Sequence, residues 1–185
     1  MSSYLWKKVN RNSILVDLEF PSEDLVQDLK IKKHSGKGLA IIGNCDGDLY
    51  YKGEKISLYK FKRKRNGRLR SSNGFELYDE LYGKPVLNSN VLDALFYNQH
   101  LIPENWKKRN EDGNILLASF WGTIYIDKRS RVLFVKYLFF DDDQRWHRGF
   151  GWLNGGWSNA YPVAVLGGEQ PRDSKIFKPC LQGRG

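Results

Sequence analysis

The sequence predicts a mixed α+β fold, with a single domain over residues 1–166 and a polar tail over 167–185. Two observations lead to this prediction. Short strand-like and helix-like patterns alternate as far as residue 110, and the following third is rich in Ile, Leu, Val, Phe and Tyr. Hydrophobic residues make up 41% of the 185 residues, which is enough for a core without disulfides or metals.

The first part of the chain contains short elements separated by turn signals. Strand patterns occupy residues 14–20, 39–42 and 55–61, and helix patterns occupy 22–29, 75–82, 88–96 and 103–108. Ser22 is expected to cap the first helix, and Asn88 or Ser89 the third. In the second helix one face is predicted to consist of Phe75, Tyr78, Leu81 and Tyr82. In the third helix Val91, Leu92, Leu95 and Phe96 fall on one side, which predicts its buried face.

The C-terminal third predicts a small antiparallel sheet. Residues 114–125 and 131–140 read as strands joined by a turn at 127–130. Residues 133–140 are apolar at both alternating sets of positions, so we expect a central strand that is covered on both faces. Residues 141–161 predict paired short strands and loops, and 161–166 a final strand.

The charge and the cysteines restrict the function only loosely. The net charge of +9 would suit nucleic acid, an anionic membrane or an acidic protein, but the basic residues are spread out, which favours a role in solubility. Cys45 and Cys180 are the two cysteines; they could pair, and free thiols are the expectation. Neither a signal peptide nor an apolar run of ~18 residues is present, so the default expectation is a cytoplasmic protein without a membrane partner.

Catalytic and metal-binding motifs are not recognisable in the sequence. His34, His100 and His147 show no metal-ligand spacing, and Gly36-Lys37-Gly38 lacks the rest of a phosphate-binding loop. Asp141-Asp142-Asp143 lacks the glycine and glutamate of a calcium loop. We therefore expect no metal, no cofactor and no enzymatic activity, with an enzyme site assembled from distant residues as an alternative.

A basic run between residues 60 and 70 is a second candidate site. It has seven Lys and Arg and no acid, and Asn66-Gly67 predicts a hairpin turn at its centre. A solvated hairpin is the simpler interpretation, and nucleic-acid binding is the alternative. The candidate contacts are Lys62, Arg63, Lys64, Arg65 and Arg68.

The strongest signal is the segment 145–161, in which tryptophans recur among small and polar residues. Indole rings are large anchors with few torsions, and Asn, Ser and Gly adapt their hydrogen bonding, a mixture that recognition loops use. Because at least two of its three tryptophans could instead be core residues of a small sheet, the segment combines a scaffold with exposed neighbours.

Several blocks of sequence carry a resemblance. The blocks are Gly83–Asp93, Leu101–Lys107, Phe120–Tyr125, Leu133–Leu138, Trp146, Trp152-Leu153, Trp157 and Pro162–Val165. They resemble a mostly uncharacterised family from ultra-small bacteria and archaea, and their order is similar to the distal half of the C-type lectin fold. That fold hosts the variable proteins of diversity-generating retroelements, in which adenine-directed mutagenesis rewrites surface residues between fixed aromatic and Gly positions.

The resemblance implies a non-enzymatic ligand-binding protein whose unknown ligand is expected to be a protein. It implies a scaffold of Trp121, Trp146, Trp152, Leu153, Trp157 and Pro162, with buried rings. It implies ligand-binding display positions at Arg145, His147, Arg148, Gly149, Gly151, Asn154, Gly155, Ser158, Asn159, Ala160 and Tyr161. Lectin calcium motifs such as Glu-Pro-Asn are absent, so calcium-dependent sugar binding is not implied.

Overall fold

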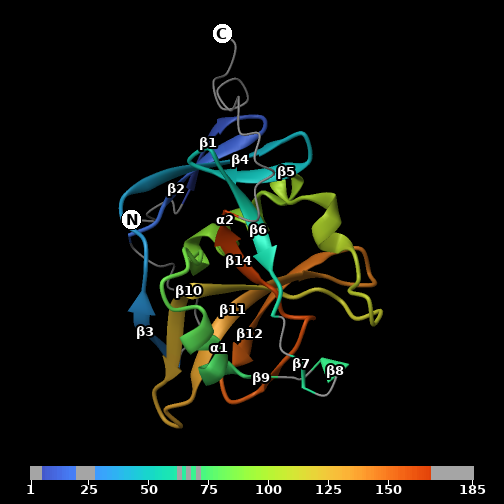
Figure 1. The fold of residues 1–185 in the computed structure, drawn as a ribbon. Helices are drawn as coiled ribbons and strands as arrows, with labels where there is room; N and C mark the ends of the chain where they lie inside the picture. The colour runs from blue at the N-terminus through green and yellow to red at the C-terminus, as the bar shows by residue number, and fades with distance from the viewer. Residues whose placement is uncertain (1–5, 20–27, 62–63, 66–67, 70–71, 168–185) are drawn as a thin grey trace.

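A computed structural model describes residues 6–19, 28–61, 64–65, 68–69 and 72–167. Within these residues the chain forms a curled ten-stranded sheet, two two-stranded sheets and two α-helices, which confirms the predicted α+β class (Figure 1). No helix in this described part is both long and apolar enough to cross a bilayer.

The N-terminal strands form one half of the large sheet. They are β1 (Trp6–Asn10), β2 (Ser13–Asp17), β4 (Leu39–Cys45), β5 (Asp48–Tyr51) and β6 (Glu54–Tyr59), which neighbour one another in this order. Tight turns join β4 to β5 and β5 to β6, and in both turns the two central residues have positive φ with glycine second (Gly47 and Gly53). The strands predicted at 14–20, 39–42 and 55–61 are thus present with small shifts in their ends.

The C-terminal strands form the other half, where β6 pairs with β14 (Val163–Leu166). The order continues through β10 (Ala118–Asp127) and β11 (Leu133–Phe140) to β12 (Trp146–Trp152) at the edge. β11 lies between β10 and β12, so its predicted central position is confirmed. The prediction that both of its faces are covered is wrong, because Tyr137 and Phe139 on one face are only half-buried. β3 (Leu29–His34) also pairs with β10, although its lysine-rich sequence did not predict a strand. The helix predicted from Ser22 falls mainly on residues 20–27, outside the described residues.

Two short antiparallel strand pairs complete the strands. β9 (Ser72–Asn73) pairs with β13 (Gly156–Trp157), and β7 (Lys64–Arg65) pairs with β8 (Arg68–Leu69). The second pair flanks Asn66-Gly67, where the sequence predicted a turn.

The two α-helices cover opposite faces of the C-terminal half of the sheet. α2 (Ser89–Tyr97) begins at the N-cap Asn88, whose side chain accepts a hydrogen bond from the Val91 backbone N–H, so of the two predicted caps, Asn88 and Ser89, the first is the one used. α1 (Gly74–Glu80) buries Leu77, and Leu81 behind it, whereas Phe75 and Tyr82 of its predicted apolar face are exposed. Two short 3-10 helices, Gln99–Leu101 and Glu104–Lys107, follow α2.

Each face of the C-terminal half has its own core. On one face α2 lies between the N-terminal strands and β10–β12, and packs against residues such as Ile42, Phe120 and Leu138 (Figure 1). On the other face α1 packs over Trp121, Val135 and Trp157. The strands β10–β12 therefore present two different surfaces, and side chains alternate between them along each strand.

Cys45 ends β4 and is disulfide-bonded, so the expectation of free thiols is wrong at this position. Cys180 lies outside the described residues, as does the predicted tail beyond Gly167.

Candidate functional site

The segment 145–161 forms β12, the short β13 and the loops around them. Five of the six predicted scaffold residues are buried: Trp121, Trp146, Leu153, Trp157 and Pro162. Of the three tryptophans of the segment, Trp146 and Trp157 are buried, which confirms the prediction that at least two are core residues. Trp152 is 63% exposed, so the expectation of a buried ring is wrong at this position. It ends β12 on the face that α2 covers, but α2 contacts the strand at Arg148, roughly 13 Å back along the strand. The ring therefore projects beyond the helix.

The opposite face of β11 and β12 carries a continuous series of aromatic rings. His147 stacks on Phe139 with ring centroids 5.4 Å apart, and Phe139 lies 5.8 Å from Tyr137. Tyr137 lies 6.3 Å from Tyr161 in an edge-on contact. We call Tyr137, Phe139, His147 and Tyr161 the aromatic row.

The aromatic row rests on buried tryptophans. The ring of Tyr161 meets Trp157 at 5.0 Å, and Trp157 meets Trp121 at 4.9 Å, both in edge-on geometry. The indole N–H of Trp157 donates to the Trp152 carbonyl at 2.9 Å, which fixes the ring. Such contacts between aromatic rings add stability beyond the area that they bury, so the base of the row is rigid.

Gly149 and Gly151 are positions where β12 passes directly beside the rings. A Cβ atom at Gly149 would lie 2.8 Å from the Tyr137 ring, and one at Gly151 would lie 2.9 Å from the Trp157 ring. Neither position has room for a side chain in this arrangement. A side chain at Gly149 would have to displace the half-buried Tyr137 ring, and one at Gly151 the buried Trp157 ring, so both glycines support the rings rather than display side chains of their own.

The polar atoms of the aromatic row are accessible to a ligand. Tyr137, Phe139 and Tyr161 are half-buried and His147 is exposed. Neither tyrosine hydroxyl has a hydrogen-bond partner among the described residues. Burial, and to a lesser extent the neighbouring Tyr161, raises the pKa of Tyr137, so its hydroxyl stays protonated at neutral pH and can donate. His147 faces the Asp141 carboxylate, with Nε2 2.5 Å from Oδ2.

The remaining predicted display positions divide by burial. Arg145 and Asn154 are exposed, and Gly155, Ser158 and Asn159 are half-buried. Ala160 is only 6% exposed, so its predicted display is wrong. Its carbonyl accepts a hydrogen bond from the Leu117 backbone N–H and its own N–H donates to the Ser158 hydroxyl, which turns the methyl group into the protein.

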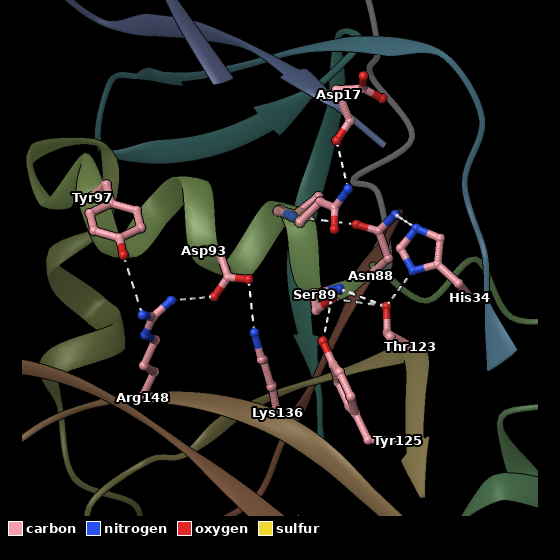
Figure 2. Close-up of polar contacts among 12 residues, drawn as sticks. Asp17, His34, Asn88, Ser89, Asp93, Tyr97, Thr123, Tyr125, Lys136 and Arg148 are labelled. Atoms are coloured by element: carbon pink, nitrogen blue, oxygen red, sulfur yellow. Dashed lines mark hydrogen bonds and ion pairs between the residues drawn. The ribbon is translucent and has the colours of Figure 1, made fainter. Parts of the chain in front are cut away.

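Arg148 lies on the α2 face and is held there by a buried charge cluster. Its guanidinium donates to Asp93 Oδ1 at 2.8 Å, and Lys136 Nζ donates to Asp93 Oδ2 at 2.9 Å (Figure 2). The side chains of Asp93 and Lys136 are 1% and 2% exposed. Arg148 also stacks over the rings of Phe96 and Tyr97. Display at Arg148 is therefore wrong, because this side chain is committed to holding α2 on the sheet.

A second polar chain fixes the start of α2 (Figure 2). The Tyr125 hydroxyl donates to Ser89 Oγ at 2.9 Å, and Ser89 Oγ donates to Thr123 Oγ1 at 3.1 Å. Thr123 Oγ1 lies 2.8 Å from His34 Nδ1, and His34 Nε2 lies 2.7 Å from the Leu18 carbonyl. Since a carbonyl only accepts, Nε2 donates to the Leu18 carbonyl. His34 is thus a hydrogen-bonded structural histidine.

The aspartates at 141–142 form ion pairs with neighbouring side chains, and the basic run at 60–70 lies only partly within the described residues. Asp141 pairs with His147, and Asp142 pairs with Arg109. Within the residues that the structure describes, no three His, Cys, Asp or Glu side chains are grouped to hold a metal. Of the candidate nucleic-acid contacts, Lys62 and Arg63 are not described, whereas Lys64, Arg65 and Arg68 lie in β7 and β8.

Sequence reasoning missed Tyr137, Phe139, Asp93 and Lys136. The first two belong to the strand predicted at 133–140, where alternation alone does not show which face is exposed. A lysine inside this apolar run was a usable signal for a buried ion pair.

Comparison of the chain with protein-family models, curated proteins and solved structures finds no match.

Proposed function

We propose that the protein is a non-enzymatic ligand-binding protein whose contact surface is the aromatic row. The observation that supports this most directly is the unbroken ring contact from Trp121 through Trp157 to the exposed His147. Tyr137 and Tyr161 add free hydroxyls to apolar rings with few torsions, so a partner can gain contact area and hydrogen bonds at low entropic cost.

A protein is the favoured ligand. The aromatic row crosses two strands and a loop, and cavities of about 350 to 450 Å³ in the described part of the chain are lined by other residues. The exposed Arg145 and Asn154 and the half-buried Ser158 and Asn159 add polar groups from the same segment. Aromatic anchors surrounded by polar groups are typical of protein interfaces.

The proposal includes the family resemblance, a C-type lectin-like variable protein of a diversity-generating retroelement. In that case Arg145, His147, Asn154, Ser158, Asn159 and Tyr161 would be the rewritten positions. Gly149, Gly151 and Ala160 would stay fixed with the buried tryptophans. The neighbouring DNA tests this part: it should encode a reverse transcriptase and a near-copy of the codons for 145–161 that differs mainly at adenines.

The binding surface is tested by capture of partners from the native host, followed by cross-linking and mass spectrometry. The test variant is Tyr137→Ser with His147→Ser and Tyr161→Ser. The matched control is Phe75→Ser with Tyr82→Ser, which also removes exposed rings but off the aromatic row. We expect the test variant to lose at least about tenfold of the captured partner, because buried aromatic anchors dominate interface energies. Equal loss in the control, or full capture by the test variant, contradicts the proposal.

A second candidate, nucleic-acid binding by the basic hairpin, is favoured by one observation. The register of β7 and β8 places Arg65 directly opposite Arg68. A hairpin with two arginines at facing register positions suits a phosphate backbone, which attracts cations whatever its base sequence. In anisotropy titrations with generic DNA over a salt series, Arg65→Gln with Arg68→Gln should lower the slope of log affinity against log salt by about 2. Weak binding that salt does not change contradicts this candidate.

A further inference from the structure

A cavity of about 360 Å³ lies beside the start of α2, away from the aromatic row. The connection from α1 to α2, β3 and the middle of β10 line it. Its floor is apolar and buried, and consists of Leu81, Leu87, Val91 and Trp121. None of the four residues of the aromatic row lines this cavity, although Trp121 of its floor also supports the row from beneath, so a ligand here would have contacts separate from those of the row.

The wall of the cavity is fixed by backbone hydrogen bonds. The Gly122 N–H donates to the Leu87 carbonyl at 2.9 Å, and the Ser35 N–H donates to the Gly122 carbonyl at 2.7 Å. A Cβ atom at Gly122 would lie 2.8 Å from the Asn88 nitrogen, so β10 and the start of α2 are in closest approach here. The cavity is thus preformed and needs little ordering to accept a ligand.

Two lysines line the cavity, and both are oriented by tyrosine rings. Lys33 Nζ donates to the Tyr78 hydroxyl at 2.8 Å and lies 4.8 Å from the centre of that ring. Lys84 Nζ lies 4.8 Å from the centre of the Tyr59 ring. An aromatic ring attracts a cation without neutralising its charge, so both ammonium groups keep their full charge.

Among the described residues, no acid pairs with Lys33 or Lys84. No Asp or Glu among these residues lines the cavity either. Glu80 on α1 accepts a hydrogen bond from Tyr59 and lies outside the lining. An apolar floor beneath two cations favours a ligand that combines an apolar body with a negative group.

We propose that this cavity binds a small organic oxyanion. A flat apolar body would lie against Leu87, Val91 and Trp121, and a carboxylate or phosphate group would face Lys33 and Lys84. Both head groups accept hydrogen bonds from ammonium groups, and such charge-assisted bonds are about twice as strong as neutral ones.

The test is isothermal titration of the full chain with three probes that share one ring system: 2-naphthoate, 2-naphthyl phosphate and the uncharged 2-naphthamide. The variants are Lys33→Gln and Lys84→Gln. Lys8→Gln on β1 is the matched control, because it removes an exposed lysine that does not line the cavity.

We expect at least one of the two anions to bind, with the tighter of them identifying the head group. Its affinity should fall about tenfold in each cavity variant and stay unchanged in Lys8→Gln. The amide should bind about tenfold more weakly than the carboxylate if the carboxylate is the head group. No binding of either anion at millimolar concentration, or an equal loss in Lys8→Gln, overturns the proposal. Either result leaves the proposal for the aromatic row untouched.

Discussion

The two faces of β12 use neighbouring residues of one strand in opposite ways. On the α2 face Arg148 is held by Asp93 and by two aromatic rings, and Lys136 beside it is almost fully buried. On the other face His147 is exposed and Gly149 has no side chain, so the rings of Tyr137 and Phe139 remain partly uncovered. One face is closed by charge pairing and the other is left open by glycine.

This difference shows how a sheet can tolerate an open aromatic surface. The closed face ties α2 to β11 and β12 through Asp93, so the strands keep their positions whatever happens on the open face. Substitutions at exposed positions of the open face should then cost little stability. Four predictions test this division, beginning with the largest expected effect.

Breaking the buried charge cluster should have the largest effect. Asp93→Asn removes the carboxylate that both Lys136 and Arg148 contact, and takes from Lys136, which is 2% exposed, the charge of this ion pair. Loss of one partner of a buried ion pair costs about 3–5 kcal/mol. Urea unfolding should show this loss, and Asp112→Asn, at an exposed carboxylate, should show almost none. A loss below about 1 kcal/mol in Asp93→Asn would mean that the cluster does not hold the closed face.

Two tryptophans at the ends of one loop provide the next test. Trp157 is 3% exposed beneath the aromatic row, and Trp152 is 63% exposed. Trp157→Ala should cost about 3–5 kcal/mol because it leaves a large cavity. Trp152→Ala should cost less than about 1 kcal/mol, since its ring already contacts water. Thermal and urea unfolding of both variants decide the matter, and equal losses would contradict the assignment of Trp157 as the base of the row.

The two glycines of the open face should differ from each other. A methyl group at Gly151 meets the buried Trp157 ring, which is hydrogen-bonded in place, so Gly151→Ala should cost about 1–3 kcal/mol. At Gly149 the methyl group meets the end of the half-buried Tyr137 ring, which can swing away, and the cost should stay below about 1 kcal/mol. In a Tyr137→Ala background the cost of Gly149→Ala should vanish. A cost that persists there would place the obstacle elsewhere.

Much of the fold followed from sequence patterns. The turn residues and the alternation located β2, β4, β6 and β11, and Asn88 located the start of α2. β3 was missed because its exposed lysines pair with β10 through the backbone, which side-chain patterns do not record. Phe75 was misassigned because a seven-residue helix offers too few turns to define a face.

Less of the candidate site could be predicted. Alternation along β12 separates His147 from Arg148, but which of the two faces carries a helix depends on contacts with distant α2. Gly149 and Gly151 resemble flexible loop glycines until the rings beside them are known. Trp152 and Trp157 have the same composition around them, but Trp157 packs against Trp121 in the core beneath α1, whereas Trp152 lies beyond the end of α2 and is exposed.

The smallest expected effect concerns pH and separates the two faces once more. Burial raises the pKa of Tyr125, whose hydroxyl lies beneath α2, and also that of the half-buried Tyr137. Because the pKa of each tyrosine is raised in the folded state, its hydroxyl ionises first in the unfolded chain, near pH 10. The stabilisation from the neutral hydroxyl is therefore complete below pH 10 and is lost as the pH rises through the folded-state pKa. The free energy of unfolding should therefore fall above pH 10.

Tyr125→Phe should make that fall shallower, and Tyr137→Phe should do so less, because its ring is partly in water. Tyr50, Tyr51 and Tyr59, whose pKa values are also raised, should sustain a residual slope in both variants. Loss of the Tyr125 hydrogen bond to Ser89 shifts the whole curve at every pH, so the slope between pH 9 and 11 in urea titrations is the decisive quantity. An unchanged slope in Tyr125→Phe would show that its hydroxyl reaches water, and that the closed face is less closed than the contacts of α2 indicate.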